Sequence, residues 1–208
     1  MTSEPTRDPS SDPLLTPENS ALIIIDYQPR QLQEVRSIEH ELLLRNIIFV
    51  ARLAKTYNVP IVLSTINVVA RNEPPTLPDL KEVLADVMEL DRTQMNAWED
   101  VEFRQAVVAT GRKKLVMTAL LTEVCLAFPS LDALREDYEV FPVVDAVGGI
   151  SRESHRAGLE RVLQAGAQPI SSVSLACEWQ RDWARVETVS HHLHLFLAAQ
   201  CGGTLNVG

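Results

Sequence analysis

The chain has 208 residues, of which 46% are hydrophobic and 23% are charged, so it can bury the core of one globular domain. Its formal net charge of −9 opposes binding to phosphate backbones and anionic lipids, and we expect neither nucleic acid nor a membrane as a partner. Three widely spaced cysteines, Cys125, Cys177 and Cys201, support neither a disulfide framework nor a zinc knuckle and predict reduced thiols.

The N-terminal segment is rich in Ser, Thr, Pro and Asp, and such a composition buries little apolar surface. We therefore expect a mobile arm over residues 1–18, unless it docks on a partner subunit, and one domain over residues 19–208. The arm lacks the positive region and apolar run of a signal peptide, and no later apolar run has the length of a membrane-spanning helix. We expect a cytoplasmic protein.

Apolar runs and amphipathic stretches alternate along the rest of the chain. The runs predict strands covered on both faces, at residues 21–26, 60–66, 114–121, 138–146 and 167–175, with a short additional strand at 87–91. The amphipathic stretches predict helices, at residues 40–57, 101–111 and 151–166. This alternation is typical of an α/β protein, here with a mainly parallel sheet of about six strands.

Three residues that can carry chemistry lie at or just past the ends of predicted strands: Asp26, Arg92 and Cys125. Ligands of open α/β sheets bind at the carboxyl ends of the strands, and the first and fourth strands of a doubly wound sheet can be neighbours. Asp26 and Cys125 could therefore meet. Taken alone, Asp26 is more typical of a helix cap or turn, and Cys125 is more typical of a buried core thiol.

The segment after Cys125, residues 126–137, is compatible with a helix. A thiol at a helix N-terminus has a lowered pKa, and the free backbone N–H groups there can hold an oxyanion. Pro129 fits a first turn but breaks a longer helix, so a helix that starts near Glu123 should kink at this proline.

Three stretches carry a family resemblance: "ALIIIDYQ" from Ala21, "DRTQMNAWED" from Asp91 and "ALLTEVCLAFPSLDAL" from Ala119. In this order and spacing they resemble the isochorismatase-like cysteine hydrolases, specifically the YcaC-like branch, over most of the chain. The resemblance implies a Rossmann-like, three-layer α/β/α sandwich and a triad in which Asp26 is the base and Cys125 the nucleophile. Arg92 stands where most of the superfamily has lysine, and arginine acts as a permanent charge rather than as an acid.

The resemblance also implies a non-proline cis peptide between Leu120 and Leu121. The backbone N–H groups of Leu121 and Cys125 would then form an oxyanion hole. Asn96, Trp98 and Thr122 would line the substrate pocket. For Asn96 and Trp98 a second interpretation, a loop capped by the asparagine with a buried tryptophan, is nearly as well supported.

Other candidate sites are weaker. In "HHLH" (191–194), only His191 and His194 share a helical face, which favours a surface or interface helix over a metal site. The metal-binding nicotinamidase relatives have an Asp and His cluster after the second strand, and residues 64–75 contain no histidine. We therefore expect no metal and no other cofactor. The stretch after the first strand has no glycine for a dinucleotide fingerprint.

Cys177 is the rival nucleophile. Trp179 and Trp183, at i and i+4, predict one packed helix face beside it, so we expect Cys177 to be a core thiol. Position 28, where an aspartyl phosphatase would place its second acid, is Gln28.

The sequence thus predicts a hydrolase that cleaves a C–N bond of amide type, or a vinyl-ether-like bond, in a small molecule through a Cys125 thioester. The alternative is an oligomeric scaffold or binding module of the same fold with little turnover. YcaC-like proteins resemble one another in forming higher homo-oligomers, so we expect a homo-oligomer, with an octamer as one candidate.

Overall fold

The computed structural model describes residues 7–201, with side chains up to Leu195. Its one sheet holds five parallel strands in the order β3-β2-β1-β4-β5, namely β1 (Ser20–Ile25), β2 (Ile61–Ile66), β3 (Glu89–Arg92), β4 (Lys114–Ala119) and β5 (Glu139–Pro142). The chain winds outward from β1 to β3 and then returns to the other side of β1 with β4. The predicted doubly wound α/β fold is confirmed, and β1 and β4 are neighbours at the point where the strand order reverses.

The sixth predicted strand, at residues 167–175, is wrong. Only Ile170 forms a single bridge, to Val143 beside β5. The chain then enters helix α8 (Ser172–Gln180), because the side chain of Ser171 accepts a hydrogen bond from the backbone N–H of Ser174 and caps the helix.

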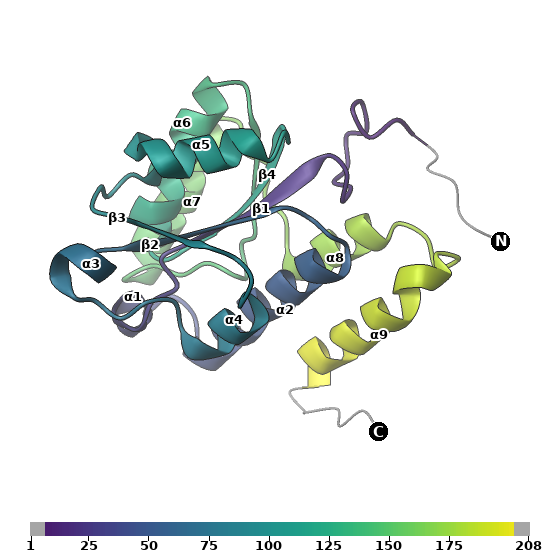
Figure 1. Ribbon diagram of the computed structural model, residues 1–208, viewed down its shortest axis with the longest axis horizontal. Helices are drawn as coiled ribbons and strands as arrows, with labels where there is room; N and C mark the ends of the chain where they lie inside the picture. The colour runs from purple at the N-terminus through teal and green to yellow at the C-terminus, as the bar shows by residue number, and fades with distance from the viewer. Residues whose placement is uncertain (1–6, 202–208) are drawn as a thin grey trace.

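Helices cover both faces of the sheet (Figure 1). One face packs against α2 (His40–Thr56), α4 (Pro78–Val83) and α8, and the other against α5 (Val101–Ala109), α6 (Ala127–Arg135) and α7 (Arg152–Gln164). Successive strand residues point to opposite faces, so Ile24 belongs to the first core and Ile23 to the second. Burial on both faces explains why the strands are continuous apolar runs.

The remaining helices are short or peripheral. They are α1 (Pro29–Glu34) and α3 (Val68–Arg71), the 3₁₀ helix η1 (Ala97–Glu99), the π-helix η2 (Thr122–Leu126), and α9 (Val186–Cys201). None of the helices in the described part of the chain is both long and apolar enough to span a membrane.

Helix α9 packs on α2 and α8 (Figure 1) and contains the "HHLH" stretch. His191 and His194 are exposed, whereas His192 is buried and its Nδ1 lies 3.1 Å from the hydroxyl of Tyr57. That hydroxyl also donates to the side-chain oxygen of Gln180 at 2.7 Å. His192 therefore helps to dock α9 on the rest of the protein.

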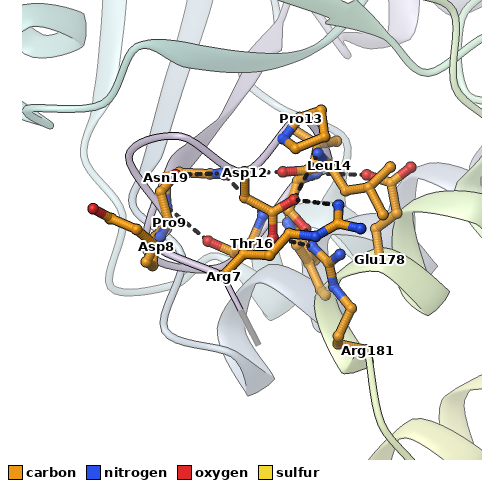
Figure 2. A network of polar contacts seen from close by, with 12 residues as sticks. Arg7, Asp8, Pro9, Asp12, Pro13, Leu14, Thr16, Asn19, Glu178 and Arg181 are labelled. Carbon is orange, nitrogen blue, oxygen red and sulfur yellow. Dashed lines mark hydrogen bonds and ion pairs between the residues drawn. The ribbon is translucent and has the colours of Figure 1, made fainter. Parts of the chain in front are cut away.

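The N-terminal segment lies against the carboxyl end of α8 (Figure 2). Asp12 forms an ion pair with Arg181 at 3.0 Å, and the backbone N–H of Leu15 donates to Glu178 at 2.6 Å. Residues 1–6 of the expected arm lie outside the described residues. The mobility of the arm and its boundary at residue 18 stay predictions.

Candidate active site

Asp26 is the first residue after β1 and is fully buried. Its φ of +61° is in the left-handed region, which Asp tolerates better than most residues. Its backbone N–H donates to the carbonyl of Ser64 at 2.9 Å, which continues the pairing with β2 by one step. The N-cap of the following helix α1 is Gln28, so the Asp26 side chain is available for contacts across the sheet.

Arg92 is the last residue of β3 and reaches past β2 to Asp26. Its two terminal nitrogens donate to the two oxygens of Asp26 at 2.7 and 2.8 Å, in a bidentate pair whose side chains are 1% and 0% exposed. Nη1 also donates to the hydroxyl of Ser64 at 3.1 Å and to the carbonyl of Thr65 at 3.0 Å. Burial acts to lower the pKa of Arg92, but the hydrogen bonds and charge of Asp26 raise it above its ordinary value. The arginine therefore remains charged.

The turn that carries Cys125 begins at the carboxyl end of β4. The peptide between Leu120 and Leu121 is cis, as predicted. A short π-helix follows, η2 (Thr122–Leu126), in which the N–H of Leu126 bonds the carbonyl of Leu121. Such wide turns are frequent at functional sites.

The helix α6 begins at Ala127, directly after the π-helix, and the N–H of Ala127 bonds the carbonyl of Thr122. Pro129 is the third residue of α6, and the kink expected at this proline stays a prediction.

Cys125 is 9% exposed and lies within reach of the carboxylate of Asp26. Burial raises the pKa of its thiol well above the ordinary range, and the charge and hydrogen bond of Asp26 raise it further. The charge of Arg92 and the backbone N–H of Leu121 act in the opposite direction and are outweighed. The expected lowering by a helix terminus is therefore wrong for the resting protein. Its Cys125 is a protonated thiol beside a carboxylate.

Asn96 and Trp98 are held by packing. The side-chain oxygen of Asn96 accepts from the N–H of Trp98 at 3.1 Å, and its nitrogen donates to Asp132 on α6 at 2.7 Å. The indole N–H of Trp98 donates to Glu136 at 3.0 Å, and its ring packs edge-on against Tyr138. This is the arrangement of the second interpretation, an Asn-capped loop with a buried tryptophan. The role of the two residues in a substrate pocket stays a prediction.

Thr122 lies in the same π-helix as Cys125 and is fully buried. Its hydroxyl is 2.8 Å from Nδ1 of His155 on α7. No sequence motif indicates His155, because the residue stands in an ordinary amphipathic helix and approaches Thr122 only in the folded chain. Gln28 has a structural role that the sequence does not indicate. It holds the loop after β2, since its amide accepts from the N–H of Ile66 and donates to the carbonyl of Pro74.

The prediction that Cys177 is a core thiol is wrong, because Cys177 is exposed. The expected tryptophan face does not form either. Trp179 is buried, whereas Trp183 is 65% exposed. Helix α8 ends at Gln180, and Arg181 has a φ of +62°, so Trp183 is outside the helix. Cys177 has no acid and arginine pair like that of Cys125 among its described contacts. The side chain of Cys201 lies outside the described ones.

Among the residues that the structure describes, no three His, Cys, Asp or Glu side chains are grouped so that they could hold a metal ion. The expectation that the protein needs no metal stays a prediction.

At the carboxyl edge of the sheet, then, a buried Asp and Arg pair faces a thiol on the turn after the neighbouring strand. Comparisons with known proteins agree with this geometry. The family profile of the isochorismatase domain matches residues 20–174, which include all three residues. The chain belongs to the isochorismatase family of hydrolases. It is 37% identical over 170 residues to the probable hydrolase YcaC of Escherichia coli K12, and the aligned part covers 81% of each chain.

Two solved members of this isochorismatase family confirm the resemblance to the YcaC-like branch. Escherichia coli YcaC, an octameric hydrolase of unknown specificity, is 31% identical with a TM-score of 0.79, over 92% of this chain and 98% of that chain. YcaC from Pseudomonas aeruginosa, solved with hexane-2,5-diol and covalent acrylamide, is 30% identical with a TM-score of 0.79, over 88% of this chain and 97% of that chain.

Proposed function

We propose that this protein hydrolyses a C–N bond of amide type in a small molecule, with Cys125 as nucleophile, Asp26 as base and Arg92 as a permanent positive charge. One observation carries the proposal. The thiol of Cys125 lies close enough to the carboxylate of Asp26 for that group to raise its pKa, and both oxygens of the carboxylate are held by Arg92. A nucleophile, its base and a group that orients the base are the parts that nucleophilic catalysis requires.

The first half of the reaction forms a thioester. The proton of the Cys125 thiol moves to Asp26, and the sulfur attacks the carbonyl carbon of the amide. An ionised carboxylate has about four lone-pair sites, so Asp26 can accept this proton while Arg92 occupies the other side of each oxygen. When the C–N bond breaks, Asp26 returns the proton to the leaving nitrogen. Arg92 keeps its proton throughout and stabilises the charged forms of its neighbours.

The carbonyl oxygen becomes negative in the transition state, and backbone N–H groups are the donors that stabilise it. The backbone N–H of Leu121 acts to lower the pKa of the Cys125 thiol, which supports its assignment as a donor beside the reacting sulfur. We assign the oxyanion hole to the N–H groups of Leu121 and Cys125. In the second half of the reaction, water gives a proton to Asp26 and attacks the thioester, which releases the acid and returns the proton to sulfur.

The test of this proposal is ammonia release from a panel of small primary amides, measured for the wild type and for Cys125→Ala. The wild type should hydrolyse at least one amide, and Cys125→Ala should release no ammonia above the protein-free rate. Cys177→Ala is the matched control and should match the wild type, because Cys177 is exposed and lacks the acid partner. Equal rates for the wild type and Cys125→Ala would remove Cys125 from the mechanism.

The expected homo-oligomer is also a proposal, and it is supported by the octameric state of Escherichia coli YcaC. Large apolar side chains are exposed around the edge strand β3. Met88 before the strand is 74% exposed, Met95 after it is 70% exposed, and Val69 on the adjacent α3 is 86% exposed. Such side chains suit a subunit interface. Light scattering of the full chain should give the mass of several chains, and the mass of a single chain would contradict the proposal. A scaffold with little turnover would assemble in the same way but fail the amide panel.

A further inference from the structure

His155 faces the turn that carries the nucleophile. It is in the first turn of α7, half-buried, and its Nδ1 lies 2.8 Å from the hydroxyl of the fully buried Thr122. Thr122 is the first residue of the π-helix that carries Cys125, and it directly follows Leu121, whose backbone N–H acts on the pKa of the thiol. The imidazole thus contacts the start of the nucleophile turn without contacting the reacting atoms.

Helix α7 and the loop before it press closely on this turn. A Cβ added to Gly158 of α7 would be 2.8 Å from Cα of Glu123, so only glycine fits there. The loop supplies two backbone bonds to the turn. The carbonyl of Gly148 accepts from the N–H of Thr122 at 2.9 Å, and the N–H of Ile150 donates to Oε1 of Glu123 at 3.0 Å. The position of the turn that carries Cys125 therefore depends on groups from α7 and from the loop before it.

The second oxygen of Glu123 has an unusual environment. Oε2 is buried and has no hydrogen-bond partner among the described residues. A Cβ on Gly149 would be 2.3 Å from this oxygen and 3.0 Å from Cβ of His155, so the carboxylate and the imidazole flank the same glycine. A buried carboxylate oxygen without a donor is unfavourable, and a nearby proton donor would stabilise it.

The protonation state of His155 follows from these surroundings. Burial lowers the pKa of His155 and the charge of Glu123 raises it by less, so the imidazole is neutral at pH 7 and Nδ1 can accept from Thr122. Glu123 is the charged group that faces it from the π-helix, and the loop of residues 148–151 has no titratable side chain. Its helical neighbours Arg152, Glu153 and Arg156 are exposed.

We propose that His155 is a positioning residue: its neutral imidazole holds the hydroxyl of Thr122 and thereby the nucleophile turn, and its protonated form turns to the unpartnered oxygen of Glu123 and releases Thr122. The site would then lose activity in acid for a reason separate from the thiol and from Asp26. This inference rests on the proposed function in taking Cys125 as the nucleophile.

The test measures the rate at which iodoacetamide alkylates Cys125, with the adduct mapped by mass spectrometry. At pH 7.5, His155→Leu and Thr122→Val should each slow the reaction about tenfold, the size of one lost hydrogen bond. The double variant should be no slower than either single variant, because both remove the same bond. His155→Asn should stay close to the wild type, since its side-chain oxygen can take the place of Nδ1. Additive effects in the double variant would overturn the proposal.

The pH profile separates positioning from packing. Below pH 7.5, loss of thiolate alone slows alkylation by about tenfold per pH unit. The wild type should fall more steeply than this at a pH below the ordinary histidine pKa of about 6.5, because burial lowers the pKa of His155, and His155→Asn should not. A protonated His155 that acted only through its charge would stabilise the thiolate and make the wild-type profile shallower. A shallower profile, or parallel profiles of the two proteins, would contradict the proposal. Because these rates do not involve hydrolysis, a failed amide panel leaves them interpretable.

Discussion

Replacing Asp26 by asparagine should lower amide hydrolysis by about 10²- to 10⁴-fold, the usual contribution of a general base, and should also make Cys125 react faster with iodoacetamide. The two effects have opposite signs for one reason. Asp26 accepts the thiol proton during turnover, and in the resting protein its charge and hydrogen bonding raise the pKa of the thiol. Without that charge, Arg92 remains as the neighbouring ion and lowers the pKa, so more thiolate is present at neutral pH.

The measurement pairs ammonia release with alkylation of Cys125 in the same preparations. Asp12→Asn is the matched control, because Asp12 is also buried and paired with an arginine, Arg181, on the segment before β1. It should change neither rate. A parallel fall of hydrolysis and alkylation in Asp26→Asn would show that Asp26 supports the structure of the site rather than acting as its base.

Replacing Arg92 by methionine should cost about 3–5 kcal/mol of the free energy of unfolding, the usual effect of removing one partner from a buried ion pair. The carboxylate of Asp26 is fully buried, and Arg92 supplies two of its hydrogen bonds. Urea denaturation measures the change. Arg104→Met is the control, because Arg104 pairs with Glu136 near the surface, where the two side chains are 51% and 37% exposed. Its effect should be much smaller.

A double variant checks the cause of this loss. Asp26→Asn combined with Arg92→Met removes both charges, so the double variant should be more stable than Arg92→Met alone. A double variant that is as unstable as the sum of the two single variants would mean that Arg92 stabilises the fold through its other contacts, with Ser64 and Thr65, rather than through Asp26.

Much of the fold could be predicted, because strands that are buried on both faces leave continuous apolar runs, as residues 21–26 do. The adjacency of β1 and β4 follows from the doubly wound pattern, and it brings the ends of these strands together. The apolar residues of the segment 167–175 suit a strand, whereas Ser171 caps a helix there. A capping serine and a strand-ending serine are indistinguishable until the helix is seen.

The proximity of the three candidate residues could be expected from the sequence, but the electrostatics of the candidate site could not. The motifs indicated Asp26, Arg92 and Cys125, and the ion pair joins residues 66 positions apart. The pKa of Cys125 could not be derived from its helix position, because burial and the approach of Asp26 outweigh that effect and both arise only on folding. His155 has no motif at all. Its partner Thr122 is 33 positions away, and only the packing of α7 on the turn brings the two together.

The central claim is that Cys125 forms a thioester, and partitioning between water and hydroxylamine tests it most directly. Two amides that share an acyl group but differ in their amine are hydrolysed by the wild type with hydroxylamine present, and free acid and hydroxamate are measured. Both amides form the same acyl-Cys125 in this account, so the ratio of hydroxamate to acid should be identical for the two. A ratio that depends on the amine would contradict the account, because water or hydroxylamine would then attack the amide itself.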